Sequence, residues 1–188
     1  MTENRKKAIA ILGSLFILCT CCGGLTFWVG SLFSQAVTTD PIKIRHIGQE
    51  IADYTLPAGY SEILGIDFMN TKTVTIAAAP AADTLIFLMQ VPEAQGVSEA
   101  EVEQQLQTIL QRFNIQPVDF TQERVETRMV NDQTVEVAFN QGSDQSGQTF
   151  KQMTAFLRSR KGKVFLMAQG SEAGWDQAGL DSLLESLR

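Results

Sequence analysis

The stretch from residue 8 to residue 33 constrains this chain more than any other, because it contains no charged residue and no proline. As an α-helix it would be roughly 39 Å long, and the hydrocarbon core of a bilayer is roughly 30 Å thick. A cleaved secretory signal has a shorter apolar region and a small-residue cleavage site. Cleavage after Ala36 stays open as an alternative, but the pattern favours a retained transmembrane helix over residues 8–33.

The charges on either side of this helix predict its orientation. Arg5, Lys6 and Lys7 directly precede it, and no lysine or arginine follows until Lys43. The positive-inside rule then predicts a cytoplasmic tail over residues 1–7. Everything after residue 33 is expected on the extracytoplasmic side, in a periplasm, a lumen or the cell exterior. The predicted protein is thus a single-pass protein of the cell or inner membrane.

All the cysteines of the chain lie inside the predicted helix, at Cys19, Cys21 and Cys22. The outer part of the chain therefore has no disulfide framework. Cys22, Thr26 and Gly30 recur at i, i+4 and i+8. Such a stripe of small residues lets another transmembrane helix approach closely, and it is the candidate helix-packing stripe of this chain.

The charge of the outer part narrows the range of functions. The chain has 15 basic and 21 acidic residues, of which 12 and 20 follow the apolar stretch, a net charge of −8 there. This balance argues against nucleic acid as a partner. With His46 as the sole histidine and no cysteine beyond the helix, the sequence predicts neither a metal site nor a cofactor.

Residues 34–52 form the predicted tether and entry segment, with 42–52 interpreted as a short helix or an ordered linker. A folded domain is then expected over residues 53–188. Alternation of polar and apolar side chains predicts its first four strands, which cover residues 54–56, 60–68, 73–77 and 84–91. The fourth is apolar enough to be a central strand that is covered on both faces.

An amphipathic helix is predicted over residues 98–113. Ser98 and Glu101 form a capping box at its start. Its apolar residues then fall on one face, at Val102, Leu106, Ile109, Leu110 and Phe113. We expect this helix to pack on a sheet.

Four further strands follow Pro117 as two hairpins. Residues 120–130 and 134–140 flank a turn at 131–133, and residues 150–160 and 163–169 flank a turn at Lys161 and Gly162. Residues 141–148 are predicted to be a flexible loop, and a terminal helix is expected with Asp176 as its N-cap. The predicted class is α+β, a mainly antiparallel sheet covered by helices.

The domain resembles the PsbP-like family, which includes the photosystem II protein PsbP and the Ran-binding Mog proteins. The resemblance rests on residues 53–60 (DYTLPAGY), on the middle helix after the fourth strand, and on residues 163–168 (KVFLMA) and 183–187 (LLESL). It implies a PsbP-like sandwich that docks onto other proteins, often at a membrane. The family has no shared catalytic set. Some members are linked to metal ions through histidines and carboxylates, but this chain has no histidine after His46.

The outer part lacks the residues for several kinds of chemistry. It has no cysteine and a single histidine in the entry segment, so nucleophilic triads lack parts. Neither G-x-x-x-x-G-K-[ST] nor G-x-G-x-x-G occurs. A pair of carboxylates acting as acid and base stays an alternative, as does a small apolar ligand bound between helix and sheet.

One local feature departs from the acidity of the domain. Four basic residues bracket the second predicted hairpin turn, Arg158, Arg160, Lys161 and Lys163. Charged side chains at such a place protect a hairpin from edge pairing. They also form a candidate docking tip for an acidic partner or for lipid headgroups. The sequence thus predicts a membrane-anchored, non-catalytic module, an accessory or assembly factor for another membrane protein, without naming the partner or ligand.

Overall fold

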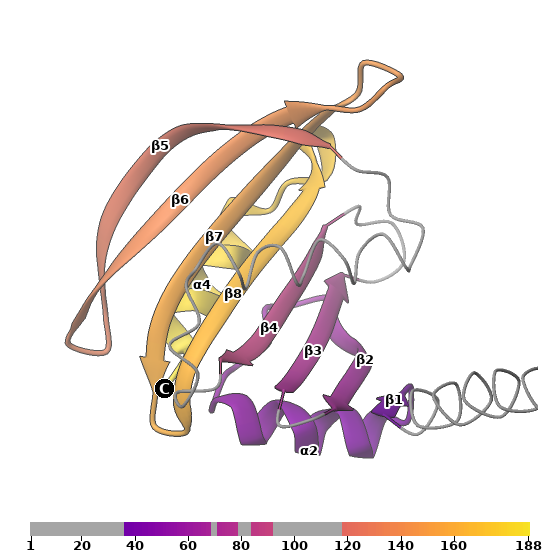
Figure 1. Ribbon diagram of the computed structural model, residues 1–188, viewed down its shortest axis with the longest axis vertical. Helices are drawn as coiled ribbons and strands as arrows, with labels where there is room; N and C mark the ends of the chain where they lie inside the picture. Colours follow the sequence, from indigo (N-terminus) through magenta and orange to yellow (C-terminus); the bar gives the residue numbers. More distant parts are fainter. Residues whose placement is uncertain (1–35, 69–70, 79–83, 92–117) are drawn as a thin grey trace, which may run out of the picture. The chain divides into compact units, whose positions relative to one another are not determined.

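The computed structural model describes residues 36–68, 71–78, 84–91 and 118–188 (Figure 1). The predicted transmembrane helix with its stripe of Cys22, Thr26 and Gly30, and the predicted helix over 98–113, lie outside these residues. Within the described ranges, no helix is long and apolar enough to cross a membrane. The chain divides into two units, Met1–Val37 and Thr38–Arg188.

An eight-stranded sheet forms the framework of the described chain (Figure 1). From β2 onward, all neighbouring strands pair antiparallel. The sheet and its helices confirm the α+β class. The order across the sheet is β1-β2-β3-β4-β8-β7-β6-β5, and the strands are β1 (Val37–Thr38), β2 (Tyr60–Phe68), β3 (Thr71–Ala78), β4 (Leu85–Val91), β5 (Asp119–Val130), β6 (Gln133–Ser143), β7 (Thr149–Ser159) and β8 (Gly162–Ser171).

Strand β4 joins two series of hairpins into one sheet. It pairs with β3 on one side and with β8 on the other, so that Phe87 lies opposite Met167. Its side chains are buried on both faces, with Ile86 and Leu88 in one apolar cluster and Phe87 and Met89 in another. The prediction that this strand is central and covered on both faces is confirmed.

Helices α2 (Pro41–Ile51) and α4 (Gln177–Ser186) contribute to the larger cluster on one face of the sheet. Asp40 caps α2 by accepting a hydrogen bond from the Ile42 N–H at 3.0 Å, and proline is favoured at the first helical position. The entry segment is therefore a helix rather than a linker, and it buries Ile44, Ile47 and Ile51.

Helix α4 confirms the predicted terminal helix. The side chain of Asp176 accepts a hydrogen bond from the Gly179 N–H at 3.0 Å, as expected of the predicted N-cap. Leu180, Leu183 and Leu184 are fully buried against the sheet. Their spacing of three and four residues places them on one helical face.

The predicted first strand, residues 54–56, is wrong. The structure has no strand there, because the neighbouring backbone pairs with the end of the described chain instead. The Asp53 N–H donates to the Arg188 carbonyl at 3.1 Å, and the Arg188 N–H donates to the Asp53 carbonyl at 2.9 Å. Tyr54 is buried in the core.

A bulge in β2 brings that strand close to α2. The register with β3 shifts between Glu62 and Leu64, which leaves Ile63 unpaired and 44% exposed. Beyond the bulge, Gly65 faces α2, where an added Cβ would lie 3.0 Å from the Cδ1 atom of Ile47. Simple alternation along the sequence did not reveal this bulge.

A buried polar cluster links α2 to β2. The Glu62 side chain, which is 8% exposed, accepts hydrogen bonds from the Tyr54 hydroxyl at 2.5 Å and from Nη1 of Arg45 at 2.8 Å. Burial, followed by the hydrogen bond to Glu62, raises the pKa of Tyr54. The hydrogen bond to Glu62 also raises the pKa of Arg45. The neutral Tyr54 hydroxyl and the charged Arg45 guanidinium thus both donate to the side chain of Glu62.

Replacing Gly48 by alanine tests how closely α2 packs on this cluster. A Cβ on Gly48 would clash with the Tyr54 hydroxyl and lie 3.1 Å from Cζ of Tyr54. Helix propensity alone would stabilise Gly48→Ala by about 1 kcal/mol. Overpacking that displaces the tyrosine costs about 1–3 kcal/mol, and disturbing its hydrogen bond to Glu62 costs about 1.5–3 kcal/mol more. We therefore expect the free energy of unfolding to fall by more than about 1 kcal/mol despite the gain in propensity.

The measurement is a urea titration of the full chain in mild detergent, followed by tryptophan fluorescence. Gln49→Ala, at an exposed neighbour on the same helix, is the control and should change the free energy by less than about 0.5 kcal/mol. A Gly48→Ala variant as stable as the wild type would contradict the described packing.

Candidate functional site

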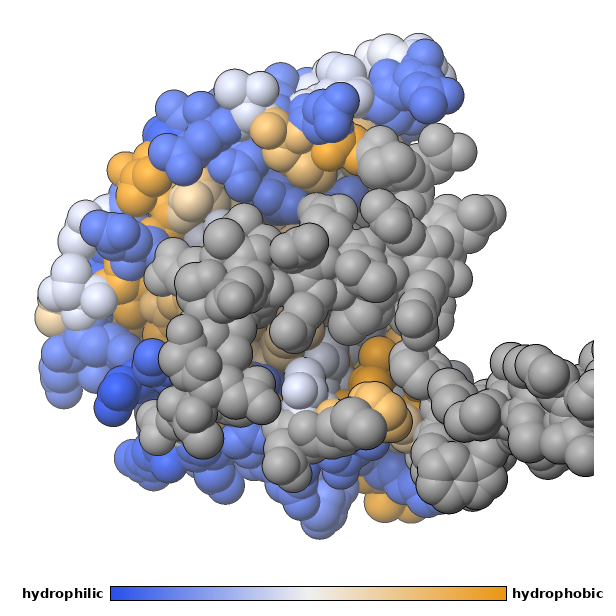
Figure 2. All heavy atoms as spheres, in the orientation of Figure 1, coloured by the Kyte–Doolittle hydropathy of each residue, from blue (hydrophilic) through white to orange (hydrophobic). Residues whose placement is uncertain are grey.

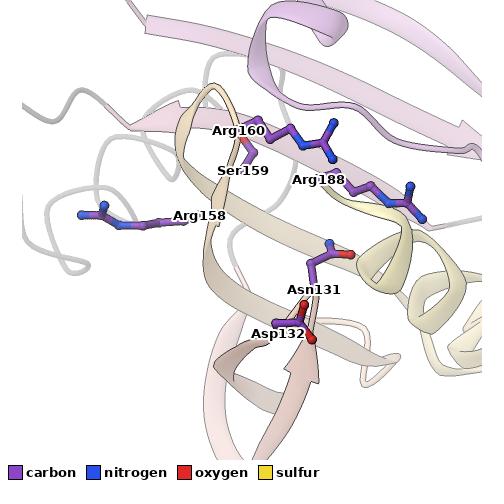
Figure 3. A pocket seen from close by; sticks show the side chains of 6 residues that line it. All are labelled: Asn131, Asp132, Arg158, Ser159, Arg160 and Arg188. Carbon is purple, nitrogen blue, oxygen red and sulfur yellow. The ribbon is translucent and has the colours of Figure 1, made fainter.

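A basic cleft lies where the β5–β6 turn and the β7–β8 turn meet Arg188, which follows the end of α4 (Figure 3). Its volume is about 440 Å³. Three of its lining residues are arginines and one is acidic. The residues that line it are Asn131, Asp132, Arg158, Ser159, Arg160 and Arg188.

The β5–β6 turn is formed by Asn131 and Asp132, both with positive φ, at 47° and 63°. Two such residues make the type I′ turn that suits the twist of a hairpin, and asparagine and aspartate tolerate it well. The Asn131 side-chain amide donates a hydrogen bond to the Leu187 carbonyl. The predicted turn is therefore confirmed at Asn131 and Asp132, whereas Gln133 is already the first residue of β6. The turn also holds the chain beyond α4.

The β7–β8 turn is fixed from both sides. The Gln133 side chain accepts a hydrogen bond from the Arg158 N–H at 2.9 Å and donates one to the Arg158 carbonyl at 2.6 Å. The Ser159 hydroxyl donates to the Ile51 carbonyl at 2.9 Å, at the end of α2. These bonds hold the backbone of one hairpin end against the other and against α2.

The four residues of the predicted docking tip do not form one patch. The side chain of Arg158 points away from those of Arg160 and Arg188 (Figure 3). Lys163 lies directly opposite Arg158 across the β7–β8 pair, so their side chains share one face of the sheet. Lys161 lies in the turn itself, and its Nζ is 3.9 Å from Oδ1 of Asp53. Of the four, Arg158 and Arg160 line the basic cleft.

Sequence reasoning missed Asn131, Asp132, Ser159 and Arg188 as members of the site. The Asn-Asp turn was visible in the sequence. Its nearness to Arg188 was not, because the two are brought together only by the antiparallel return of the chain. Arg160 and Arg188 are exposed, and their side chains extend in similar directions (Figure 3). Guanidinium groups in such an arrangement bind carboxylates or phosphates through paired N–H donors.

A second, smaller cleft lies beside α2. Its volume is about 100 Å³, and its lining residues are Arg45, Gln49, Ala52, Asp53 and Tyr54. Each of the two clefts is thus lined by one acidic residue, Asp132 in the first and Asp53 in the second. Acid–base catalysis by two carboxylates needs both at one place. Neither cleft supplies such a pair.

No group of three or more histidine, cysteine or acidic side chains in the described ranges is arranged to hold a metal ion. His46 is exposed on α2, where its Nδ1 lies 3.2 Å from Oε1 of Glu50. The two residues are one helical turn apart, so this contact is local to the surface of the helix.

Comparisons of the sequence with models of protein families and with curated proteins found no match. Among solved structures, the chain is similar to LpqN, a protein involved in cell envelope biogenesis of Mycobacterium tuberculosis. The identity is 13%, the alignment covers 72% of this chain and 81% of LpqN, and the TM-score is 0.35.

Substitutions at Asn131 test how the cleft is held together. Asn131→Ala removes the hydrogen bond to Leu187 and places a less tolerant residue at positive φ. We expect the free energy of unfolding to fall by about 1–2 kcal/mol. Asn131→Gly removes the same bond but accepts the backbone conformation, so it should cost less. Urea titration of both variants separates the two contributions. Unchanged stability in both would contradict the role of this residue.

Proposed function

We propose that this chain is a membrane-anchored, non-catalytic interaction module whose folded part lies outside the cytoplasm. Its predicted anchor is the helix over residues 8–33. Its role is that of an accessory or assembly factor, and it docks onto an acidic segment of another membrane protein through the basic cleft. The observation that carries the proposal is a cleft lined by arginines on an otherwise acidic domain, where the exposed side chains of Arg160 and Arg188 extend in similar directions.

The composition of the cleft supports a carboxylate-bearing protein segment as its occupant. Arginine presents a rigid fork of donors that fits carboxylates in pairs. The cleft volume of about 440 Å³ accommodates several side chains. Asn131 adds an amide group beside the arginines, and only one of its two side-chain N–H groups is needed for the bond to Leu187. A short acidic segment would therefore find both charge and hydrogen-bonding partners there.

The charge of the domain as a whole favours protein over lipid. Residues 34–188 carry a net charge of −8, which disfavours close contact with an anionic membrane surface. A local basic cleft can still select an acidic segment that reaches it, because exposed charges are screened beyond about 8 Å at physiological ionic strength. The PsbP-like resemblance, which implies docking onto other proteins, is consistent with this role.

Charge reversal in the cleft tests the proposal. We expect Arg160→Glu/Arg188→Glu to fold normally, because both side chains are exposed. The full-length chain is purified in mild detergent at fixed ionic strength, and proteins present in stoichiometric amounts are quantified by mass spectrometry. The variant should lose at least about nine-tenths of an acidic partner, a tenfold change that corresponds to about 1.4 kcal/mol.

Lys43→Glu/Lys163→Glu is the matched control. It makes the same change in net charge at two exposed positions that do not line the cleft. This variant should retain the partner. Equal loss in both variants would assign the effect to overall charge, and equal retention would exclude the cleft as the docking site.

A further inference from the structure

Strand β5 is one edge of the sheet. It is twelve residues long and pairs only with β6 among the described strands (Figure 1). No other described strand pairs with the N–H and C=O groups on its outer side, and such an edge is a template for pairing with another chain. Proteins commonly protect such an edge with charged side chains, and β5 carries several. Two of these charges, Glu126 and Arg128, are opposite in sign and lie on either side of Thr127.

The central residues of β5 are complementary to the same residues in reverse order. Residues 125–129 (VETRM) have an apolar residue at each end, opposite charges next to these, and threonine in the middle. Val125 is 47% exposed and Met129 is 66% exposed, so both apolar ends face solvent. Figure 2 shows hydrophobic atoms among hydrophilic ones along the outer strands of the sheet.

We infer that β5 pairs antiparallel with β5 of a second copy of this chain, about a two-fold axis at Thr127. In this register Thr127 lies opposite Thr127 of the second copy. Glu126 lies opposite Arg128 of the second copy, and Val125 lies opposite Met129 of the second copy. By symmetry each of these unlike pairs occurs twice, so the edge is complementary to itself.

The charges select this register over its neighbours. A two-fold axis perpendicular to the sheet lies midway between the two copies of one residue. This follows because residues opposite each other in antiparallel strands point to the same face of the sheet. An axis at Glu126 or at Arg128 places two like charges directly opposite each other, which is unfavourable. An axis at Val125 extends the pairing into the bulge between Gln122 and Arg124. The axis at Thr127 keeps the paired segment 124–130 clear of that bulge.

The charged side chains are already ordered in the single chain. Nη2 of Arg128 donates to Oε2 of Glu126 at 2.6 Å, and Nη1 of Arg128 donates to Oδ1 of Asp181 at 2.6 Å. The hydrogen bond from Arg128 lowers the pKa of Glu126, so this carboxylate is charged at neutral pH. The guanidinium of Arg124 stacks 4.1 Å from the ring centroid of Phe139. Pairing with a second copy therefore extends an existing charge network.

Two double substitutions at the exposed apolar pair test both the pairing and its register. In Val125→Lys/Met129→Lys, like charges face each other at both positions across the axis. In Val125→Glu/Met129→Lys, opposite charges face each other there. Both variants alter the same solvent-exposed residues, so both should fold.

Sedimentation equilibrium of the full-length chain in density-matched detergent micelles gives the dimer dissociation constant. We expect the wild type and the Glu/Lys variant to form dimers, and the Lys/Lys variant to dissociate at least about tenfold more readily. A monomeric wild type would overturn the inference. A dimer that is equally strong in both variants would also overturn it, and would point to the predicted membrane helix instead.

A disulfide test locates the axis. Thr127→Cys is introduced into a chain in which Cys19, Cys21 and Cys22 are replaced by serine, and the detergent-solubilised protein is oxidised. Cβ atoms of opposite residues in antiparallel strands lie about 5 Å apart, and a small movement of the strands brings them within the roughly 4.5 Å that a disulfide spans. Thr121→Cys in the same background is the control, because its copies would lie roughly 40 Å apart. Cross-linking at position 127 alone is the expected result, whereas its absence, or equal cross-linking at both positions, would contradict the register.

Discussion

The pairing of β4 with β8 is the contact on which the rest of the described structure depends. It joins strands that are far apart in the sequence, with Leu85 opposite Gln169 and Val91 opposite Lys163. Each of these central strands buries side chains on both faces, including Phe165 and Leu166 of β8. A fully buried side chain of this size contributes about 1.5–3 kcal/mol, so the pairing is supported by packing on both sides. Without it, the β2–β4 and β5–β8 series would be separate.

The order of strands β5 to β8 determines where the residues of the basic cleft meet. The two turns after β5 and β7 lie near each other because β6 and β7 are neighbours in the sheet. The return of α4 along the sheet then brings Leu187 to the β5–β6 turn, where Asn131 binds its carbonyl. The basic cleft is thus a product of topology. It is built from backbone contacts at hairpin ends, and its arginines extend from these fixed positions.

Local signals in the sequence predicted much of this fold. Alternation in residues 60–68 and 84–91, the Asn-Asp turn and the Asp176 cap all act over a few residues, so they are visible without the structure. The segment 54–56 was predicted wrongly because the contacts that fix it are distant in sequence. The neighbouring Asp53 backbone pairs with that of Arg188, and the Thr55 N–H donates to the Ser186 hydroxyl. The β2 bulge and the different directions of the Arg158 and Arg160 side chains were likewise not predicted. Periodicity carries no information about these.

NMR of the full-length chain in detergent, with a hexaglutamate peptide as probe, measures whether the basic cleft binds acidic protein segments. We expect the largest shifts at the Arg160 and Arg188 Nε–H groups and at the Asn131 side-chain amide, and we expect added salt to reverse them. Shifts confined to Lys43 and Lys163, which do not line the cleft, or no shifts at millimolar peptide, would contradict the proposal.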